Sequence, residues 1–137
     1  MSPEMTNGNP KWMTWVGWIM TVLPVAMFIM GGVMGLTKQK TAVDGLVQYG
    51  YPENVGVILA GVQLACALLY IIPQTSVLGA ILFTGYLGGA VATHVRAGES
   101  NWYIAVIFGV VVWGGLFLRD ARVRALIPYR KSLLSQR

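Results

Sequence analysis

Charged side chains are scarce in this chain of 137 residues, and they are absent from four long segments. Only 11% of the residues are Asp, Glu, Lys or Arg, against about 25% in a typical soluble domain. None of them occurs in segments 14–36, 55–72, 77–95 and 102–118. Acidic and basic groups inside such segments usually mark proton relays and ion paths. Their absence argues against an ion-coupled transporter.

Other chemical groups are scarce as well. The single cysteine, Cys66, excludes an internal disulfide, and one cysteine with one histidine, His94, does not make up the ligand set of a zinc or haem site. The chain has no Gly-rich phosphate loop, no G-x-S-x-G and no H-E-x-x-H motif. We therefore expect no metal site, and hydrolytic and nucleotide chemistry have no support.

The four uncharged segments are themselves the main positive feature. Each has about the 17 to 25 residues that a helix needs to cross a hydrocarbon core of about 30 Å. Helices satisfy their own backbone hydrogen bonds in lipid. The sequence therefore predicts an all-α fold, a four-transmembrane-helix bundle that forms one membrane domain over residues 14–118 and contacts the lipid bilayer.

The basic residues predict the orientation of this bundle. Six of the ten follow the last segment, in a basic tail over residues 119–137, and Lys11 lies in the N-terminal tail, residues 1–13. Basic residues near membrane ends stay on the cytoplasmic side, so we expect both termini to be cytoplasmic, with Lys38, Lys40 and Arg96 outside. Attraction to anionic lipid headgroups explains the net charge of +5, and nucleic acid is not an expected partner.

The first outer loop and the small residues predict finer structure. Ala42, Val43, Leu46, Val47 and Tyr49 lie among polar residues as in a short amphipathic helix at the membrane surface, either a lid over the bundle or simple loop packing. Glycine and alanine recur four residues apart, which lets helix backbones approach closely. We expect these pairs to pack helices within the bundle, with a homo-oligomer face as the alternative; the pairs are Gly31/Gly35, Gly56/Ala60, Gly61/Ala65, Gly85/Gly89 and Gly88/Ala92.

Polar side chains within the segments are the candidate ligand contacts. Gln63, Thr84 and Tyr86 are expected near the bilayer midplane, and Trp113 on the inner half of the last helix. Together they can line a small cavity with an amide, hydroxyls and an aromatic wall. The alternative is that each polar group simply bonds a neighbouring helix.

His94 is expected at the outer end of the third helix, two residues before Arg96. Its loop can bring Glu99 close, and Asp44 or Glu53 can approach from the first outer loop. A lone histidine can act as a general base or proton carrier. It is therefore the candidate catalytic residue, and a polar residue satisfied at a helix end is the alternative.

Several runs resemble the DoxX-like family of small bacterial membrane proteins. The most specific is LGAILFTGYLGGA at 78–90, continuing to ATHVR at 92–96; further similar runs are YGYP at 49–52 and VWGGLFLRD at 112–120. The resemblance covers nearly all the chain beyond the first dozen residues. It implies a four-helix bundle in the bacterial cytoplasmic (inner) membrane, and the residues that match the pattern are Thr84, Tyr86, His94, Arg96, Trp113 and Arg119.

The resemblance implies less about activity. The wider DoxX group includes subunits associated with thiosulfate:quinone oxidoreduction, so a quinone is the cofactor it suggests. Members often carry Glu where this chain has Gln63, and an amide cannot relay a proton as a carboxylate does. The leading hypothesis is a protein that binds a quinone or apolar metabolite, in support of membrane redox chemistry. Its candidate ligand-binding residues are Gln63, Thr84, Tyr86, Arg96 and Trp113, with His94 as the acid/base.

Two other functions remain open at the level of sequence. A non-catalytic accessory subunit or assembly factor would use the small-residue faces and the basic tail to bind a membrane protein partner. A channel would require a continuous polar stripe through the membrane, which the four segments do not show.

Overall fold

The computed structural model describes residues 10–127 and, within them, all regular structure is helical. The all-α prediction is confirmed. Residues 1–9 and 128–137, which carry most of the expected N-terminal tail and the basic positions Arg130, Lys131 and Arg137, lie outside the described residues. The elements are α1 (Lys11–Leu36), α2 (Lys40–Gln48), α3 (Val55–Ile71), η2 (Pro73–Thr75), α4 (Ser76–Arg96), η3 (Ser100–Trp102), α5 (Tyr103–Arg119) and α6 (Ala121–Leu126).

Three helical stretches are long and apolar enough to cross a membrane: Lys11–Leu36, Pro73–Arg96 and Ser100–Arg119. The remaining apolar helix, α3, is shorter at 17 residues. Large apolar side chains such as Ile19, Ile58 and Val110 are more than half exposed on the outside of these helices. Such surfaces suit contact with lipid rather than water.

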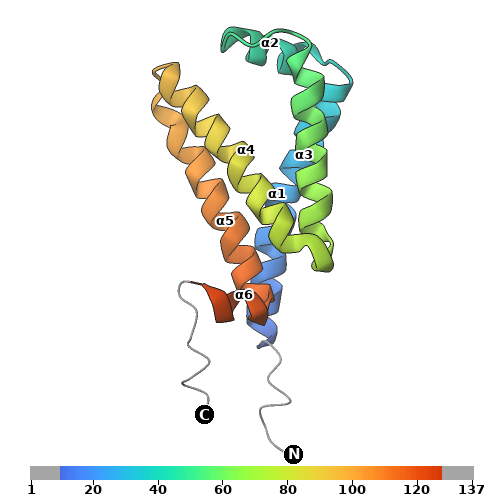
Figure 1. Ribbon diagram of the computed structural model, residues 1–137, viewed down its shortest axis with the longest axis vertical. Coiled ribbons are helices and arrows are strands. Elements are labelled where there is room, and N and C mark those ends of the chain that lie inside the picture. Colours follow the sequence, from blue (N-terminus) through green and yellow to red (C-terminus); the bar gives the residue numbers. More distant parts are fainter. Residues whose placement is uncertain (1–9, 128–137) are drawn as a thin grey trace, which may run out of the picture.

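The helices form a ring in which α1 and α4 each pack on both α3 and α5. Phe28 of α1, Phe83 of α4 and Tyr70 of α3 stack at its centre. Figure 1 shows that the helices converge at the α6 end and diverge toward the opposite end, where α2 crosses above the gap. The bundle therefore has a closed end and an open end.

Polar contacts hold the closed end together. The Tyr70 hydroxyl donates to the carbonyl of Val112, which joins α3 to α5. Arg119 Nη2 donates to the carbonyl of Tyr70 at 3.0 Å, and its guanidinium lies 4.7 Å from the ring centroid of Trp18 on α1. One arginine at the end of α5 therefore contacts two other helices.

The small residues divide into two groups. A Cβ built on Gly35 would lie 2.7 Å from that of Ala60, and one on Gly31 would lie 2.9 Å from Gln63 Nε2, so the α1–α3 contact uses them as expected. At Gly61, Gly85, Gly88 and Gly89, in contrast, a Cβ would meet no atom within 4 Å. The prediction that these positions pack helices within the bundle is wrong, because they border open space.

The short helix expected between the first two segments is confirmed as α2. Its side chains Leu46 and Tyr49 face a hollow at the open end of the bundle. The helix ends before Gly50, whose φ of +87° lies in the left-handed region that glycine adopts without strain. The chain then turns back into α3.

Candidate functional site

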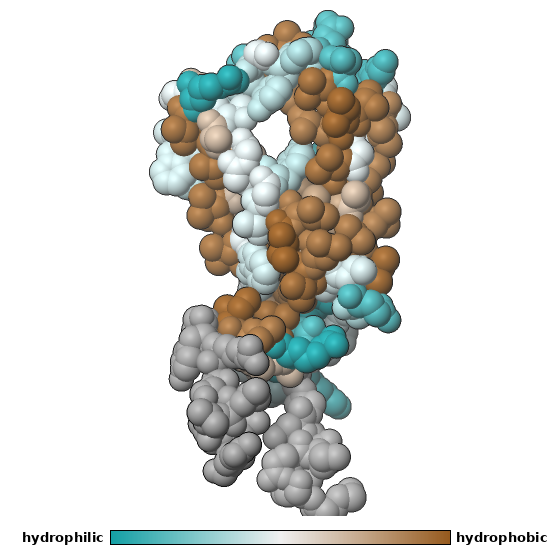
Figure 2. All heavy atoms as spheres, viewed as in Figure 1, coloured by the Kyte–Doolittle hydropathy of each residue, from teal (hydrophilic) through white to brown (hydrophobic). Residues whose placement is uncertain are grey.

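A chamber of about 340 Å³ lies under α2 between α3 and α4. Figure 2 shows the molecule hollowed through at this place, so the chamber opens sideways between the helices. It extends along α4 from His94 to Gly85, about 13 Å at 1.5 Å per residue. The residues around it are Leu46, Tyr49, Tyr51, Leu59, Gly85, Tyr86, Gly89, Ala90, Thr93 and His94.

A hydrogen-bonded cluster of His94, Glu99 and Tyr49 forms one rim of the chamber. His94 Nδ1 lies 2.6 Å from Glu99 Oε2, and the Tyr49 hydroxyl donates to the same carboxylate at 2.9 Å. The rings of Tyr49 and His94 meet edge to face at 5.3 Å. The expectation that the loop after α4 brings Glu99 to His94 is confirmed. Asp44 and Glu53 lie instead around a separate hollow with Lys38 and Lys40.

The cluster determines which nitrogen of His94 carries a proton. Hydrogen bonds from His94 and Tyr49 lower the pKa of the Glu99 carboxyl, so this group is ionised at neutral pH and can only accept. His94 Nδ1 must therefore be the donor. In the neutral ring this leaves Nε2 as an acceptor. A carboxylate on the other ring nitrogen orients an imidazole in this way for proton transfer.

Arg96 attaches α2 to α4 rather than lining the chamber. Its Nη2 donates to the Tyr49 carbonyl at 2.7 Å. Tyr51, just beyond α2, adds a hydrogen bond between its hydroxyl and Thr93 Oγ1 at 2.8 Å. Together with the Glu99 bonds, these contacts fix the lid helix over the open end.

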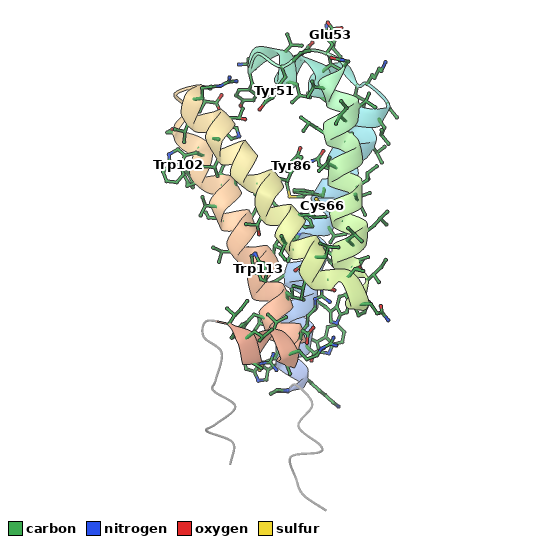
Figure 3. The ribbon with its side chains drawn as sticks, viewed as in Figure 1. Tyr51, Glu53, Cys66, Tyr86, Trp102 and Trp113 are labelled. Carbon is green, nitrogen blue, oxygen red and sulfur yellow. The ribbon has the colours of Figure 1, made fainter. Side chains whose placement is uncertain are left out.

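Tyr86 and Gln63 occupy the deeper part of the open end. Tyr86 lies below Tyr51 in Figure 3 and packs edge-on against Phe28 of α1. Gln63 follows Leu59 by one helical turn on α3, but it is not among the chamber residues, and its amide lies against Gly31 of α1. Within residues 10–127 neither the Tyr86 hydroxyl nor the Gln63 amide has a hydrogen-bond partner. The Tyr86 hydroxyl, which lines the chamber, is therefore free for a ligand.

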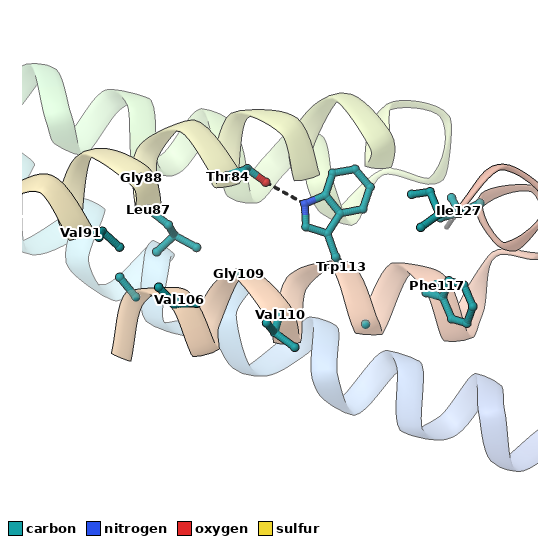
Figure 4. Close-up of a pocket in the computed structure, with 13 residues that line it drawn as sticks. Thr84, Leu87, Gly88, Val91, Val106, Gly109, Val110, Trp113, Phe117 and Ile127 are labelled. Atoms are coloured by element: carbon teal, nitrogen blue, oxygen red, sulfur yellow. Dashed lines mark hydrogen bonds between the residues drawn. The ribbon is translucent and has the colours of Figure 1, made fainter. Parts of the chain in front are cut away.

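Thr84 and Trp113 lie on a different face of the bundle. Trp113 Nε1 donates to Thr84 Oγ1 at 2.7 Å, and both residues border a groove between α4 and α5 (Figure 4). Thr84 and Tyr86 are two positions apart, which separates their directions by about 200° on an α-helix. The structure therefore splits the predicted cavity into two. Tyr86 and His94 line the chamber, while Thr84 and Trp113 line the groove.

The family model described as the DoxX-like family matches residues 19–115. The chain belongs to the DoxX-like family. None of the curated proteins and none of the solved structures matches it. Family membership and the exposed apolar helices together make this DoxX-like protein an integral membrane protein.

Sequence reasoning missed several residues of this DoxX-like site. Tyr49 was recognised only as part of an amphipathic helix, and Tyr51, Leu59 and Thr93 were not singled out. For Tyr49 and Tyr51 the sequence did hold a signal, because two aromatic hydroxyls cluster there at the end of the amphipathic helix. Within residues 10–127, no three His, Cys, Asp or Glu side chains are grouped as a metal site would need.

Proposed function

We propose that the chamber binds a lipophilic small molecule that carries a hydrogen-bond acceptor, such as a quinone or an apolar ketone. The observation that carries this proposal is that the free Tyr86 hydroxyl and the oriented imidazole of His94 line the same hollow, at different depths, and that this hollow opens between the helices. A hydrophobic site with a few convergent polar groups is the usual form of a small-molecule pocket.

Each side of the chamber has a distinct role in the proposal. Leu59 and Ala90 supply apolar walls, and Tyr86 supplies a hydroxyl donor at mid-depth. His94 lies at the outer end, where Nε2 can accept a proton or, when protonated, donate one. The chamber residues thus fit a quinone, whose ring is apolar and whose carbonyl oxygens accept hydrogen bonds. Such a ligand would supply the redox chemistry, while the protein binds it and handles a proton at His94.

Lateral entry agrees with a membrane-borne ligand. The chamber is open between the helices rather than only toward water (Figure 2). A lipophilic molecule partitions into the bilayer, so it reaches this opening without crossing the aqueous phase. Gly85 and Gly89 widen the chamber on the α4 side, because neither has a side chain to fill it.

The function requires a definite topology, which we propose to be four spans with both termini in the cytoplasm of a bacterium. The 17 residues of α3 reach about 25 Å, at the lower limit for a span. The α3–α4 connection and the α4–α5 connection would then lie on opposite sides. Cysteines introduced as Gln74→Cys and Ser100→Cys should react with an impermeant maleimide from inside and outside respectively. Labelling of both from one side would reject this topology.

Binding of a short-chain ubiquinone analogue to the full chain in mild detergent tests the proposal. Gly89→Leu should weaken binding strongly, because leucine fills the chamber. Gly61→Leu is the matched control, since it adds the same side chain on the exposed outer face of α3, where a Cβ also meets open space. Equal affinity of the Gly89→Leu and wild-type proteins would place the ligand elsewhere, and no binding to wild type would reject the quinone.

A further inference from the structure

The groove between α4 and α5 is larger than the chamber, at about 580 Å³, and lies on another face of α4. It runs past Leu87 and Val91 on one side and past Val106 and Val110 on the other (Figure 4). Along α5 it extends from Ala105 to Phe117, about 18 Å at 1.5 Å per residue. The groove is therefore long, and it opens toward the surroundings of the bundle.

The groove offers no free polar group to an occupant. The Trp113 indole N–H is taken by Thr84 Oγ1, and the Thr84 hydroxyl donates to the carbonyl of Ala80 at 2.8 Å. The other lining side chains are apolar or are glycines. A quinone ring or a peptide would leave its own polar groups unpaired here, at a cost in free energy. A hydrocarbon chain carries no such groups.

The width of the groove depends on glycine. A Cβ at Gly88 would meet no atom within 4 Å, and one at Gly109 would come no closer than 3.9 Å to Leu87 Cδ1. Neither glycine is therefore required by close helix packing. Their effect is to keep a channel open along the α4–α5 seam.

Positive charge lies at one end of the groove. Val123 and Ile127 close it there, and α6 places Arg122 and Arg124 beside them. Arg124 Nη1 lies 2.7 Å from the carbonyl of Phe117, itself a groove residue, and the Arg122 side chain is 83% exposed. The guanidinium of Arg119 points instead toward Tyr70 and Trp18. Arg122, Arg124 and Asp120, which pairs with Arg122 Nε at 3.2 Å, therefore give this end of the groove a net charge of 2 − 1 = +1. An anionic headgroup complements this charge.

We propose that the groove binds a phospholipid with an anionic headgroup, with one acyl chain along the α4–α5 seam and the phosphate at Arg122 and Arg124. An acyl chain suits the apolar walls and the satisfied polar groups of the groove. An anionic headgroup suits the arginines at its end. The site is separate from the chamber, so the proposal does not depend on what the chamber binds.

Native mass spectrometry of the full chain tests this proposal. The protein is exchanged into mild detergent with equal amounts of phosphatidylglycerol and phosphatidylethanolamine that share the same acyl chains. Wild type should retain one phosphatidylglycerol in preference to phosphatidylethanolamine. Gly88→Leu should lose the bound lipid, because leucine fills the groove. Gly85→Leu, which adds the same side chain to the chamber face of the same helix, should keep it.

Charge is tested separately with Arg122→Gln. Loss of one basic residue near a lipid surface should reduce the preference for phosphatidylglycerol by about fivefold. Quenching of Trp113 by brominated acyl chains, measured as the difference between wild type and Trp113→Phe, provides a readout in intact vesicles. Equal retention of both lipids by wild type, unchanged retention in Gly88→Leu, or no quenching assigned to Trp113 would overturn the proposal.

Discussion

The two ends of the bundle use polar side chains in opposite ways. At the α6 end, Tyr70, Ser76 and Arg119 bond to one another or to backbone carbonyls across α3, α4 and α5. At the α2 end, the helices diverge and the polar contacts lie at the rim of the chamber, where His94 and Glu99 are about a quarter and a third exposed. The first arrangement fills space, and the second surrounds it.

This difference shows how a small bundle can hold a cavity in its membrane domain. At the closed end close backbone contacts join α1 to α5, where a Cβ on Gly115 would lie 3.1 Å from the carbonyl of Gly17, whereas at the open end, for the part of the chain that the structure describes, they join only α1 and α3, through Gly35 and Ala60. The open end has few such contacts between α4 and α3. There, α2 is attached to the end of α4 by a few hydrogen bonds and lies over the chamber. Local stability in proteins varies in this way, and binding regions belong to the less stable parts.

Gly79→Ala should be the most damaging change to the closed end. An alanine Cβ here would collide with backbone atoms of Tyr70. Backbone atoms cannot move aside as the end of a flexible side chain can. We expect a loss of about 3 kcal/mol or more in the free energy of unfolding, measured by thermal or denaturant unfolding in detergent. Gly85→Ala at the open end is the control. It should change stability little or add up to about 1 kcal/mol through helix propensity.

A pair of arginine substitutions compares the ends directly. Arg119→Met removes the hydrogen bond to the Tyr70 carbonyl and the contacts with the Trp18 and Tyr70 rings, so it should lower the unfolding free energy by about 2 kcal/mol. Arg96→Met removes an exposed hydrogen bond to Tyr49 and should cost less than about 1 kcal/mol. Equal losses in both variants would show that the ends are equally stable.

The contacts that hold α2 over the open end should depend on pH. The pKa of Glu99 is lowered by hydrogen bonds from His94 and then Tyr49, so its contribution is present above the ordinary glutamate pKa and disappears as pH falls through the lowered value. The pKa of Tyr49 is raised, first by its hydrogen bond to Glu99, so its contribution is present below about 10 and disappears as pH rises through the raised value. The lid is therefore most firmly held near neutral pH.

Spin-label distances between Gln48→Cys and Ala97→Cys report on this lid. The distribution should be narrow at pH 7 and broaden on acidification, as Glu99 takes up a proton. In a Glu99→Gln background it should be broad and insensitive to acid. A wild-type distribution as broad at pH 7 as that of the Glu99→Gln variant would contradict the assigned role of Glu99.

Tyr86→Phe should have the smallest effect on the fold. Its hydroxyl has no partner within the described residues, while the ring keeps its contact with Phe28. We expect unchanged stability and ligand affinity lower by about fivefold to tenfold, the value of one hydrogen bond of about 1 to 1.5 kcal/mol. Unchanged affinity in the same ubiquinone-analogue assay would remove Tyr86 from the ligand contacts.

The candidate site was only partly predictable from sequence. His94 and Glu99 are joined by a short loop, so their contact followed from local spacing. Tyr49 is 45 residues from His94. The sequence left open whether its helix forms a lid over the bundle, and it did not indicate that Tyr49 meets His94. Four residues were expected around one cavity from their estimated depths, but depth does not specify which way a side chain points. Three of them, Gln63, Thr84 and Tyr86, were placed near the midplane, and Trp113 on the inner half.

The sequence by itself determined the membrane class, the helical fold and the approximate ends of its helices. Long uncharged segments are stable in the hydrocarbon core, and there each segment must form its own backbone hydrogen bonds, as a helix does. The tertiary structure decided which glycines pack helices and which border open space, and it divided the polar residues between a chamber and a groove. The reason is helix rotation. Apolar side chains surround each helix almost evenly, so the choice of which face turns inward depends on contacts with its neighbours.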